Sequence, residues 1–293
     1  MALRETLLRG LNVSLSRVTG YELRRQVKQV KAPKKTPALA AMPREERLVK
    51  APVFILSSVR SGSTLLRVLL GSHSELHAPH ELHLSNLRVR LRTYNTQKSM
   101  AEIGLDKRGL EHLLWDRLLD RQLRLSGKRT LVNKTPSDVF IWRRILETWP
   151  DARFIFLLRH PMSVVESRQA SHPEEPLEES MRLTMRFMTA VEEARQALPG
   201  PTVRYEQLTA DPEGTTKELC TYLGVEWEPG MLEYGSGIEG SFHRGLGDWS
   251  KQIRSGEIQP ARPLPSPEDV PAPLHDLCRA WGYLPDDETA QVL

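Results

Sequence analysis

Residues 52–66 read PVFILSSVRSGSTLL, and this stretch decides the fold class. Its first part, Val53–Leu56, is a β-branched and aromatic run of the kind that forms a buried parallel strand. The chain then turns at residues 60–64 and enters LLRVLLGSH, residues 65–73, whose apolar residues have helical spacing. The stretch therefore predicts a strand, a tight loop and a helix that begins near Gly62.

Strand and helix patterns alternate along the rest of the chain. Further strands are predicted at Thr130–Asn133, Arg153–Leu158 and Val203–Tyr205. Further helices are predicted at residues 108–125, at Ser137–Trp149 with Ser137 as the cap, and at residues 181–198. Such alternation predicts an α/β fold, a single domain with a central parallel sheet flanked by helices.

Basic charge is concentrated at the N-terminus. The chain of 293 residues has 41 Lys or Arg and 37 Asp or Glu, and residues 1–50 hold twelve of the former and four of the latter. Residues 31–52 are rich in Pro, Lys and Ala and read as a linker. We therefore predict a basic N-terminal arm over residues 1–50 and one domain over residues 51–293, with a Pro-rich tail. The arm either docks on an acidic partner, such as a carrier protein, or is a solvated helix and linker.

Several observations favour a cytoplasmic protein. The two cysteines, Cys220 and Cys278, fit a reducing compartment, and neither has metal-ligand spacing. The sequence has no apolar run of membrane-spanning length, and residues 1–26 lack the apolar core of a signal peptide. We expect no membrane span and no bound metal.

The loop at residues 57–64 has the features of an anion-binding site. Unpaired backbone N–H groups and the helix dipole attract an anion to a helix start, and Gly62 lets the backbone approach it closely. The hydroxyls of Ser61, Ser63 and Thr64 and the guanidinium of Arg60 add donors. These groups suit a phosphate that carries a sulfate.

A Walker A loop is the first alternative, and it implies a P-loop kinase-like phosphotransferase. That motif requires Gly-x4-Gly-Lys-Ser/Thr, but Ser57 stands at the first Gly and Ser63 at the Lys. The second alternative is a non-enzymatic nucleic-acid-binding protein that uses the basic arm. Because the sequence has no recognisable binding motif or aromatic stacking platform, we expect no nucleic acid partner.

A second motif, FIFLLRHPMSVVESR, covers residues 154–168. An apolar strand ends at Arg159, and His160-Pro161 opens a helix, where Pro is favoured in the first turn. Ser167 lies eight residues after Arg159, about two helical turns along. Arg159 and Ser167 can therefore converge on one phosphate.

These two motifs resemble those of sulfotransferases that use 3′-phosphoadenosine-5′-phosphosulfate (PAPS). Residues Arg60–Leu65 are similar to the 5′-phosphosulfate loop, which includes Leu65, and residues 159–168 are similar to the 3′-phosphate motif. The resemblance covers residues 51–260. It implies the family's P-loop-like fold, PAPS as donor, adenosine 3′,5′-bisphosphate as product, and no metal.

Three further segments carry the same resemblance. VRYEQL, residues 203–208, resembles the strand whose Tyr, here Tyr205, lies near the adenine. NKTP, residues 133–136, resembles the Asn-Lys-x-Pro of the tyrosylprotein-type branch. RGLGDW, residues 244–249, resembles the late segment that touches the 3′-phosphate, which implies roles for Arg244 and Gly245.

Departures from the pattern place the chain within the family. Cytosolic members carry Lys where this chain has Arg60, and their late segment is one residue longer. The chain instead resembles the Arg-Ser-Gly-Ser/Thr-Thr branch, which includes tyrosylprotein-type and bacterial sulfotransferases. Some of the latter act on carrier-protein-bound substrates in natural product biosynthesis.

The catalytic base is expected in HAPHELH, residues 77–83. Sulfuryl transfer by in-line displacement needs positioning, a base and cations. Glu81 resembles the Pro-x-Glu base of bacterial members and comes first; His80, whose ring titrates in a suitable range, is second, and His83 is third. The resemblance implies that Lys134 stabilises the leaving oxygen together with Arg60. The acceptor stays open between a carrier-bound acyl chain, a small natural product and a peptide tyrosine.

Overall fold

The computed structural model describes residues 43–234 and 256–285, which fall into two compact parts. The smaller part is residues 89–108 and contains helix α3 (Tyr94–Glu102), whose first turn is capped by the hydroxyl of Thr93. The larger part comprises residues 43–88, 109–234 and 256–285 and contains the sheet. The predicted boundary at residue 50 stays a prediction.

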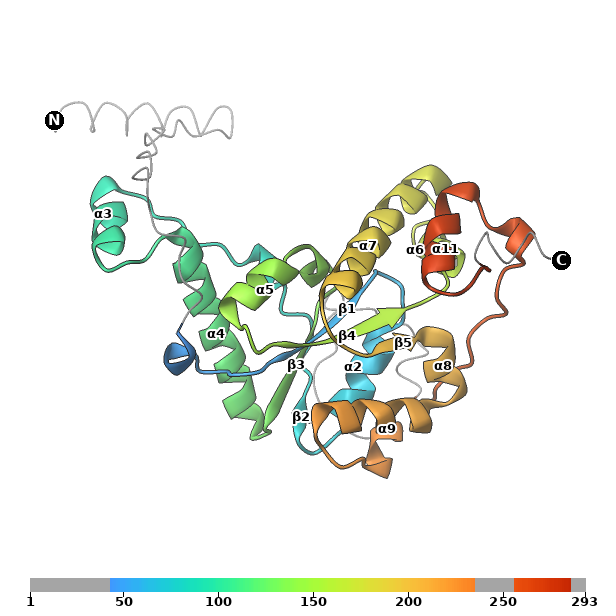
Figure 1. Ribbon diagram of the computed structural model, residues 1–293, viewed down its shortest axis with the longest axis horizontal. Coiled ribbons are helices and arrows are strands. Elements are labelled where there is room, and N and C mark those ends of the chain that lie inside the picture. Colours follow the sequence, from blue (N-terminus) through green and yellow to red (C-terminus); the bar gives the residue numbers. More distant parts are fainter. Residues whose placement is uncertain (1–42, 235–255, 286–293) are drawn as a thin grey trace, which may run out of the picture. The chain divides into compact units, whose positions relative to one another are not determined.

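The larger part is built on one five-stranded parallel sheet with the order β2-β3-β1-β4-β5 (Figure 1). The strands are β1 (Val53–Ser57), β2 (Leu76–His77), β3 (Thr130–Lys134), β4 (Arg153–Leu158) and β5 (Thr202–Arg204). In the central strand, Val53 lies opposite Val132 of β3 and opposite Arg153 of β4. The predicted α/β fold with a central parallel sheet is confirmed.

Helices cover both faces of this sheet. They are α2 (Ser63–Gly71), α4 (Lys107–Ser126), α5 (Trp142–Thr148), α6 (Pro161–Ser171), α7 (Leu177–Ala197), α8 (Tyr205–Ala210), α9 (Pro212–Leu223) and α11 (His275–Ala280). Short 3₁₀ turns are η1 (Arg44–Glu46), η2 (Leu84–Asn86), η3 (Pro136–Phe140), η4 (Pro229–Leu232), η5 (Pro267–Asp269) and η6 (Ala272–Leu274). None of the helices in the described ranges is both long and apolar enough to span a membrane.

Two apolar clusters fill the space between the sheet and its helices. Phe54 and Leu56 of β1 pack in a first cluster with residues of α4, α5, α6, α7 and α11. Val53 and Ile55 point to the opposite face and pack in a second cluster with residues of α2, α8 and α9. Figure 1 shows α5 and α7 on one side of the sheet and α8 and α9 on the other. Every residue of β1 is buried, as the apolar run predicts for a central parallel strand.

The helix predicted over Ser137–Trp149 is wrong in its first half. The chain forms the 3₁₀ turn η3 there, and α5 begins only afterwards. Ser137 does not cap a helix, because its Oγ lies 3.2 Å from Oγ of Ser85. Oδ2 of Asp138 accepts a hydrogen bond from Asn133 Nδ2 at 2.6 Å. These two contacts, one with the distant Ser85 and one with the nearby Asn133, occupy the polar side chains of the turn.

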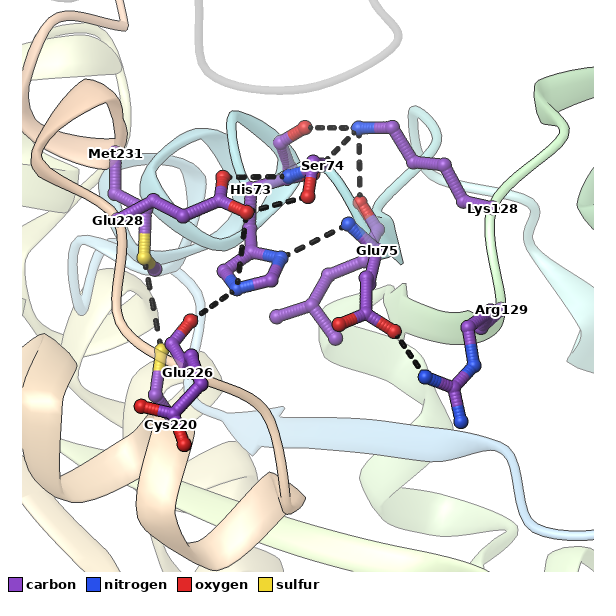
Figure 2. A network of polar contacts seen from close by, with 11 residues as sticks. His73, Ser74, Glu75, Lys128, Arg129, Cys220, Glu226, Glu228 and Met231 are labelled. Atoms are coloured by element: carbon purple, nitrogen blue, oxygen red, sulfur yellow. Dashed lines mark hydrogen bonds and ion pairs between the residues drawn. The ribbon is translucent and has the colours of Figure 1, made fainter.

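The C-terminal end of α2 is fixed by one lysine (Figure 2). Nζ of Lys128 donates to the carbonyl oxygens of Gly71 at 2.8 Å, His73 at 2.8 Å and Leu76 at 3.1 Å. A cation at this end of a helix satisfies carbonyls that have no intrahelical partner and complements the helix dipole.

The turn after α2 is tied to the segment that follows α9. Nδ1 of His73 accepts from the Glu75 amide at 2.9 Å, so Nε2 carries the proton and donates to the Glu226 carbonyl at 2.7 Å. The Glu228 carboxylate accepts from both the amide and the hydroxyl of Ser74, as Figure 2 shows. With one end of α2 anchored, the other end is held in place next to the loop at residues 57–62.

Candidate active site

The loop between β1 and α2 is shaped for an anion. Gly62 is the N-cap of α2 with φ of 84°, and a Cβ there would lie 2.2 Å from Cδ2 of Tyr205, so only glycine fits. The hydroxyls of Ser57, Ser58 and Ser61 are buried and have no hydrogen-bond partner among the described residues. Because buried polar groups are nearly always satisfied, these hydroxyls are suited to a ligand that accepts hydrogen bonds.

The first turn of α2 contacts both the second apolar cluster and Lys134 at the end of β3. Leu65 donates its amide to the Gly62 carbonyl at 3.0 Å and packs its side chain in the second cluster. Ser63 begins the helix, and Oγ1 of Thr64 accepts from Nζ of Lys134 at 3.4 Å. The loop is therefore connected directly to the end of β3.

The two predicted anion motifs meet at the carboxyl ends of β1 and β4. Nη1 of Arg159 donates to the Arg60 carbonyl at 3.0 Å, and Nε of Arg60 donates to Oγ of Ser167 on α6 at 3.3 Å. Arg60 has φ of 64°, a left-handed conformation that is uncommon for a non-glycine residue and often marks a functional site. The helix with Pro161 in its first turn begins where the sequence predicts it.

Tyr205 joins these motifs. The strand predicted to include it ends at Arg204, and Tyr205 is instead the first residue of α8. Its ring lies against Gly62 and under the guanidinium of Arg159, whose Cζ is 4.6 Å from the ring centroid. Tyr205 therefore contacts residues of both motifs at once.

Glu81 and Lys134 form a nearly buried ion pair. Nζ of Lys134 lies 2.5 Å from Oε1 of Glu81, and the two side chains are 2% and 12% exposed. Nε2 of His83 lies 3.5 Å from Oε2 of the same carboxylate. His80 is exposed, and its Nδ1 lies 3.1 Å from the Glu81 backbone carbonyl. Of the three candidates for the base, Glu81 is the one in contact with Lys134.

Two residues near this ion pair were not predicted from the sequence as site residues. Arg67 of α2 donates to the Ala78 carbonyl at 3.0 Å; burial lowers the pKa of its guanidinium, and the charge of Glu81 opposes that shift. Asp138 is fully buried, and this burial, with the charge of Glu81, raises its pKa to about 8. Arg67 lies four residues after Ser63 on the same helix, which is the one signal the sequence offered for it.

Two predicted residues, Arg244 and Gly245, lie outside the described residues. Among residues 43–234 and 256–285, no group of three or more His, Cys, Asp or Glu side chains is placed to hold a metal ion.

Comparison with known proteins agrees with this geometry. A family model described as the sulfotransferase family matches residues 52–229, which contain both anion motifs. The protein-tyrosine sulfotransferase of Drosophila melanogaster is 22% identical over 197 residues, which cover 62% of this chain and 40% of the fly protein. An omega-hydroxy-beta-dihydromenaquinone-9 sulfotransferase of Mycobacterium tuberculosis is 30% identical over 132 residues, 38% of this chain and 34% of that protein. The chain thus spans less than half the length of these two relatives.

Solved structures give the same result over a larger share of the chain. The sulfotransferase domain of the Synechococcus PCC 7002 olefin synthase is 25% identical, with a TM-score of 0.58, and the match covers 80% of this chain and 97% of that one. A sulfotransferase domain from the curacin biosynthetic pathway has the same identity and TM-score. Because the family model covers more than half of the chain, and the fold agrees, this protein belongs to the sulfotransferase family.

Proposed function

We propose that this enzyme transfers a sulfuryl group from PAPS to an acceptor hydroxyl by in-line displacement. The observation that carries the proposal is the contact between Arg159 and the Arg60 carbonyl, which brings two anion-binding motifs into one site. The three unsatisfied serine hydroxyls of the loop support it, since they fit a phosphosulfate that accepts several hydrogen bonds.

Each end of the donor has its own residues in this proposal. The 5′-phosphosulfate is assigned to the loop from Arg60 to Leu65, and the 3′-phosphate to Arg159 and Ser167. Tyr205 lies between them and is assigned to the nucleoside. The family resemblance adds Arg244 and Gly245 to the 3′-phosphate site.

Glu81 is proposed as the base that removes the proton of the acceptor hydroxyl. PAPS, when bound, supplies the sulfuryl group and a leaving bisphosphate whose bridging oxygen gains negative charge. Lys134 contacts both Thr64 in the loop and the Glu81 carboxylate, so one ammonium lies between the proposed sulfate site and the proposed base. A cation in this place stabilises the leaving oxygen and orients the base. His80 remains the alternative base.

Two similar solved structures support a proposal for the class of acceptor. Two similar sulfotransferase domains come from an olefin synthase and from the curacin biosynthetic pathway. We propose a hydroxyl on a small molecule or on a carrier-protein-bound chain in natural product biosynthesis, in the cytoplasm. An acidic carrier protein docking on the basic arm is part of the same proposal.

The experiment is incubation of the protein with sulfur-labelled PAPS and a panel of acceptors that includes acyl carrier proteins. We expect label to move to at least one acceptor without added metal, and Arg159→Ala to abolish the transfer. Magnesium-dependent turnover of ATP with no sulfate transfer would favour the kinase-like alternative instead.

A further inference from the structure

Helix α11 ends in a turn that fixes the position of one tyrosine. The amide of Tyr283 donates to the Cys278 carbonyl at 2.7 Å, and the amide of Gly282 donates to the Arg279 carbonyl at 2.9 Å. Together with the left-handed φ of 70° at Gly282, these bonds form a Schellman motif at the end of the helix. The motif sets the direction in which the chain leaves α11, and Tyr283 packs half-buried against the first cluster.

The ring of Tyr283 is held from two sides. Cζ of Arg204 lies 5.3 Å from its centroid, and the ring of His160 packs edge-on at a centroid distance of 4.9 Å. Nη2 of Arg204 also donates to the Trp281 carbonyl at 2.7 Å, and the Trp281 indole donates to Oε2 of Glu192 on α7 at 2.9 Å. Figure 1 shows α11, in red, beside α7. These contacts leave the Tyr283 hydroxyl in one defined place.

The Tyr283 hydroxyl holds one oxygen of a carboxylate. It donates to Oε2 of Glu206 at 2.6 Å, and Oε1 of Glu206 accepts from the backbone amide of His160 at 3.1 Å. Burial, and then the charge of Glu206, raises the pKa of Tyr283, so the hydroxyl keeps its proton and is the donor. His160 is the N-cap of α6, and the carboxylate therefore lies where the helix dipole favours negative charge. Both oxygens of Glu206 are thus engaged by uncharged donors.

Glu206 is a neighbour of Arg159, which the proposed function assigns to the 3′-phosphate. His160 follows Arg159 in the chain. Tyr205, which precedes Glu206, has its ring centroid 4.6 Å from Cζ of Arg159. Burial lowers the pKa of Arg159, and the charges of Tyr205 and Glu206 oppose that shift. Because a guanidinium pairs with carboxylate and with phosphate through the same N–H donors, a Glu206 carboxylate that was free to turn would compete with the phosphate for Arg159.

We propose that Tyr283 is a positioning residue of the donor site. Its hydroxyl holds the Glu206 carboxylate on the first turn of α6 and away from the Arg159 guanidinium, which stays available to the 3′-phosphate. Tyr283 itself does not contact the nucleotide. The inference rests on the proposed function, because it takes Arg159 to bind a phosphate of the donor.

The test is a double-mutant cycle that measures calorimetric affinity for adenosine 3′,5′-bisphosphate. Tyr283→Phe keeps the ring between Arg204 and His160 but frees the carboxylate, so affinity should fall by about tenfold, the size expected when one charge-assisted interaction is lost. Glu206→Gln keeps an oxygen for the His160 amide and has no charge with which to compete. Adding Tyr283→Phe to Glu206→Gln should therefore leave the affinity of that variant unchanged.

Two comparisons separate this role from a purely structural one. If Tyr283 acted only through packing, loss of its hydroxyl would reduce affinity by the same factor with glutamate or with glutamine at position 206. Tyr222→Phe is the matched control, because Tyr222 is a half-buried tyrosine that packs against the second cluster instead of the first. It should bind the bisphosphate as the unaltered protein does.

Each outcome bears on a separate claim. Unchanged affinity in Tyr283→Phe would overturn the role of the hydroxyl. Equal losses in the two backgrounds would show that Tyr283 does not act through Glu206, which also overturns the proposal. If the unaltered protein does not bind adenosine 3′,5′-bisphosphate, the proposed function fails, and the inference fails with it.

Discussion

Arg159 donates a hydrogen bond to the backbone carbonyl of Arg60 at 3.0 Å, although the two residues are 99 positions apart in the chain. Each follows a strand of the same parallel sheet, and β1 and β4 are direct neighbours. The carboxyl ends of adjacent parallel strands meet at one edge, which is where open α/β sheets bind their ligands. One bisphosphate can therefore be held by both motifs.

Replacing Arg159 with alanine should remove nucleotide binding while leaving the fold intact. The side chain supplies charge-assisted donors for the 3′-phosphate, so we expect affinity for adenosine 3′,5′-bisphosphate to fall by about a hundredfold. Arg143→Ala is a suitable control, because Arg143 forms an exposed ion pair with Glu193. Unchanged calorimetric affinity in Arg159→Ala, with an intact circular dichroism spectrum, would count against the assignment.

Gly62→Ala should destabilise the protein and weaken nucleotide binding. The left-handed backbone at φ of 84° costs about 1–3 kcal/mol for a residue with a Cβ, and the methyl group would also meet the Tyr205 ring. Gly224→Ala is the matched control, since Gly224 has φ of 71° and nothing within 4 Å of its Cβ position. Chemical denaturation should show the larger loss for Gly62→Ala. Equal losses would mean that the contact between Gly62 and Tyr205 has no energetic weight.

Glu81→Gln should reduce turnover by a factor of about a hundred to ten thousand, the range typical for loss of a general base. Glutamine can still accept a hydrogen bond from Lys134, so affinity for the donor should change little. His80→Ala is the comparison variant. Because the ring of His80 is exposed, its removal should leave turnover unchanged. If turnover survives in Glu81→Gln and is lost in His80→Ala, then His80 is the base.

Asp138 should make stability fall as the pH rises from about 4 to about 8. Burial, and then the charge of Glu81, raises its pKa from 3.8 to about 8, so the folded protein binds a proton in this range that the unfolded chain has released. Folding is then favoured at the lower pH. The charge of Lys134, a neighbour of Asp138, lowers the pKa of Asp138 and so opposes the shift. A second cation, Arg186 of α7, lies over the ring of Phe140 in the same 3₁₀ turn.

Thermal unfolding of Asp138→Asn checks this prediction. The variant keeps an acceptor for Asn133 but has no carboxyl to titrate. As the pH rises from about 4 to about 8, the melting temperature of the unaltered protein should fall relative to that of the variant. Above pH 8 the difference between the two melting temperatures should stay constant. Parallel curves for the two proteins between pH 4 and pH 8 would show that the pKa of Asp138 is not raised.

The sequence predicted those parts of the site that are local. The strand before Arg60, the helix after Gly62 and the helix opened by Pro161 each follow from a short stretch with its own turn residues and hydrophobic period. The sequence placed Ser167 in one motif with Arg159, but it did not predict the contact of Nε of Arg60 with Oγ of Ser167. These strands and helices could be predicted because the backbone conformation of a short stretch depends mainly on its own residues.

Contacts between residues far apart in the chain could not be predicted from the sequence. Ser137 was interpreted as a helix cap, but Ser85, 52 positions away, holds its hydroxyl. Glu206 and Tyr283 are 77 positions apart, and no local pattern joins them. The same reason explains why Asp138 was missed: its protonation depends on burial and on Glu81, which only tertiary packing brings near.

A crystal structure of the protein with adenosine 3′,5′-bisphosphate tests the central claim most directly. The account predicts the 5′-phosphate within hydrogen-bond distance of the loop at residues 60–65 and the 3′-phosphate on Arg159 and Ser167. A nucleotide bound elsewhere, or one whose two phosphates contact only one of these motifs, would contradict it.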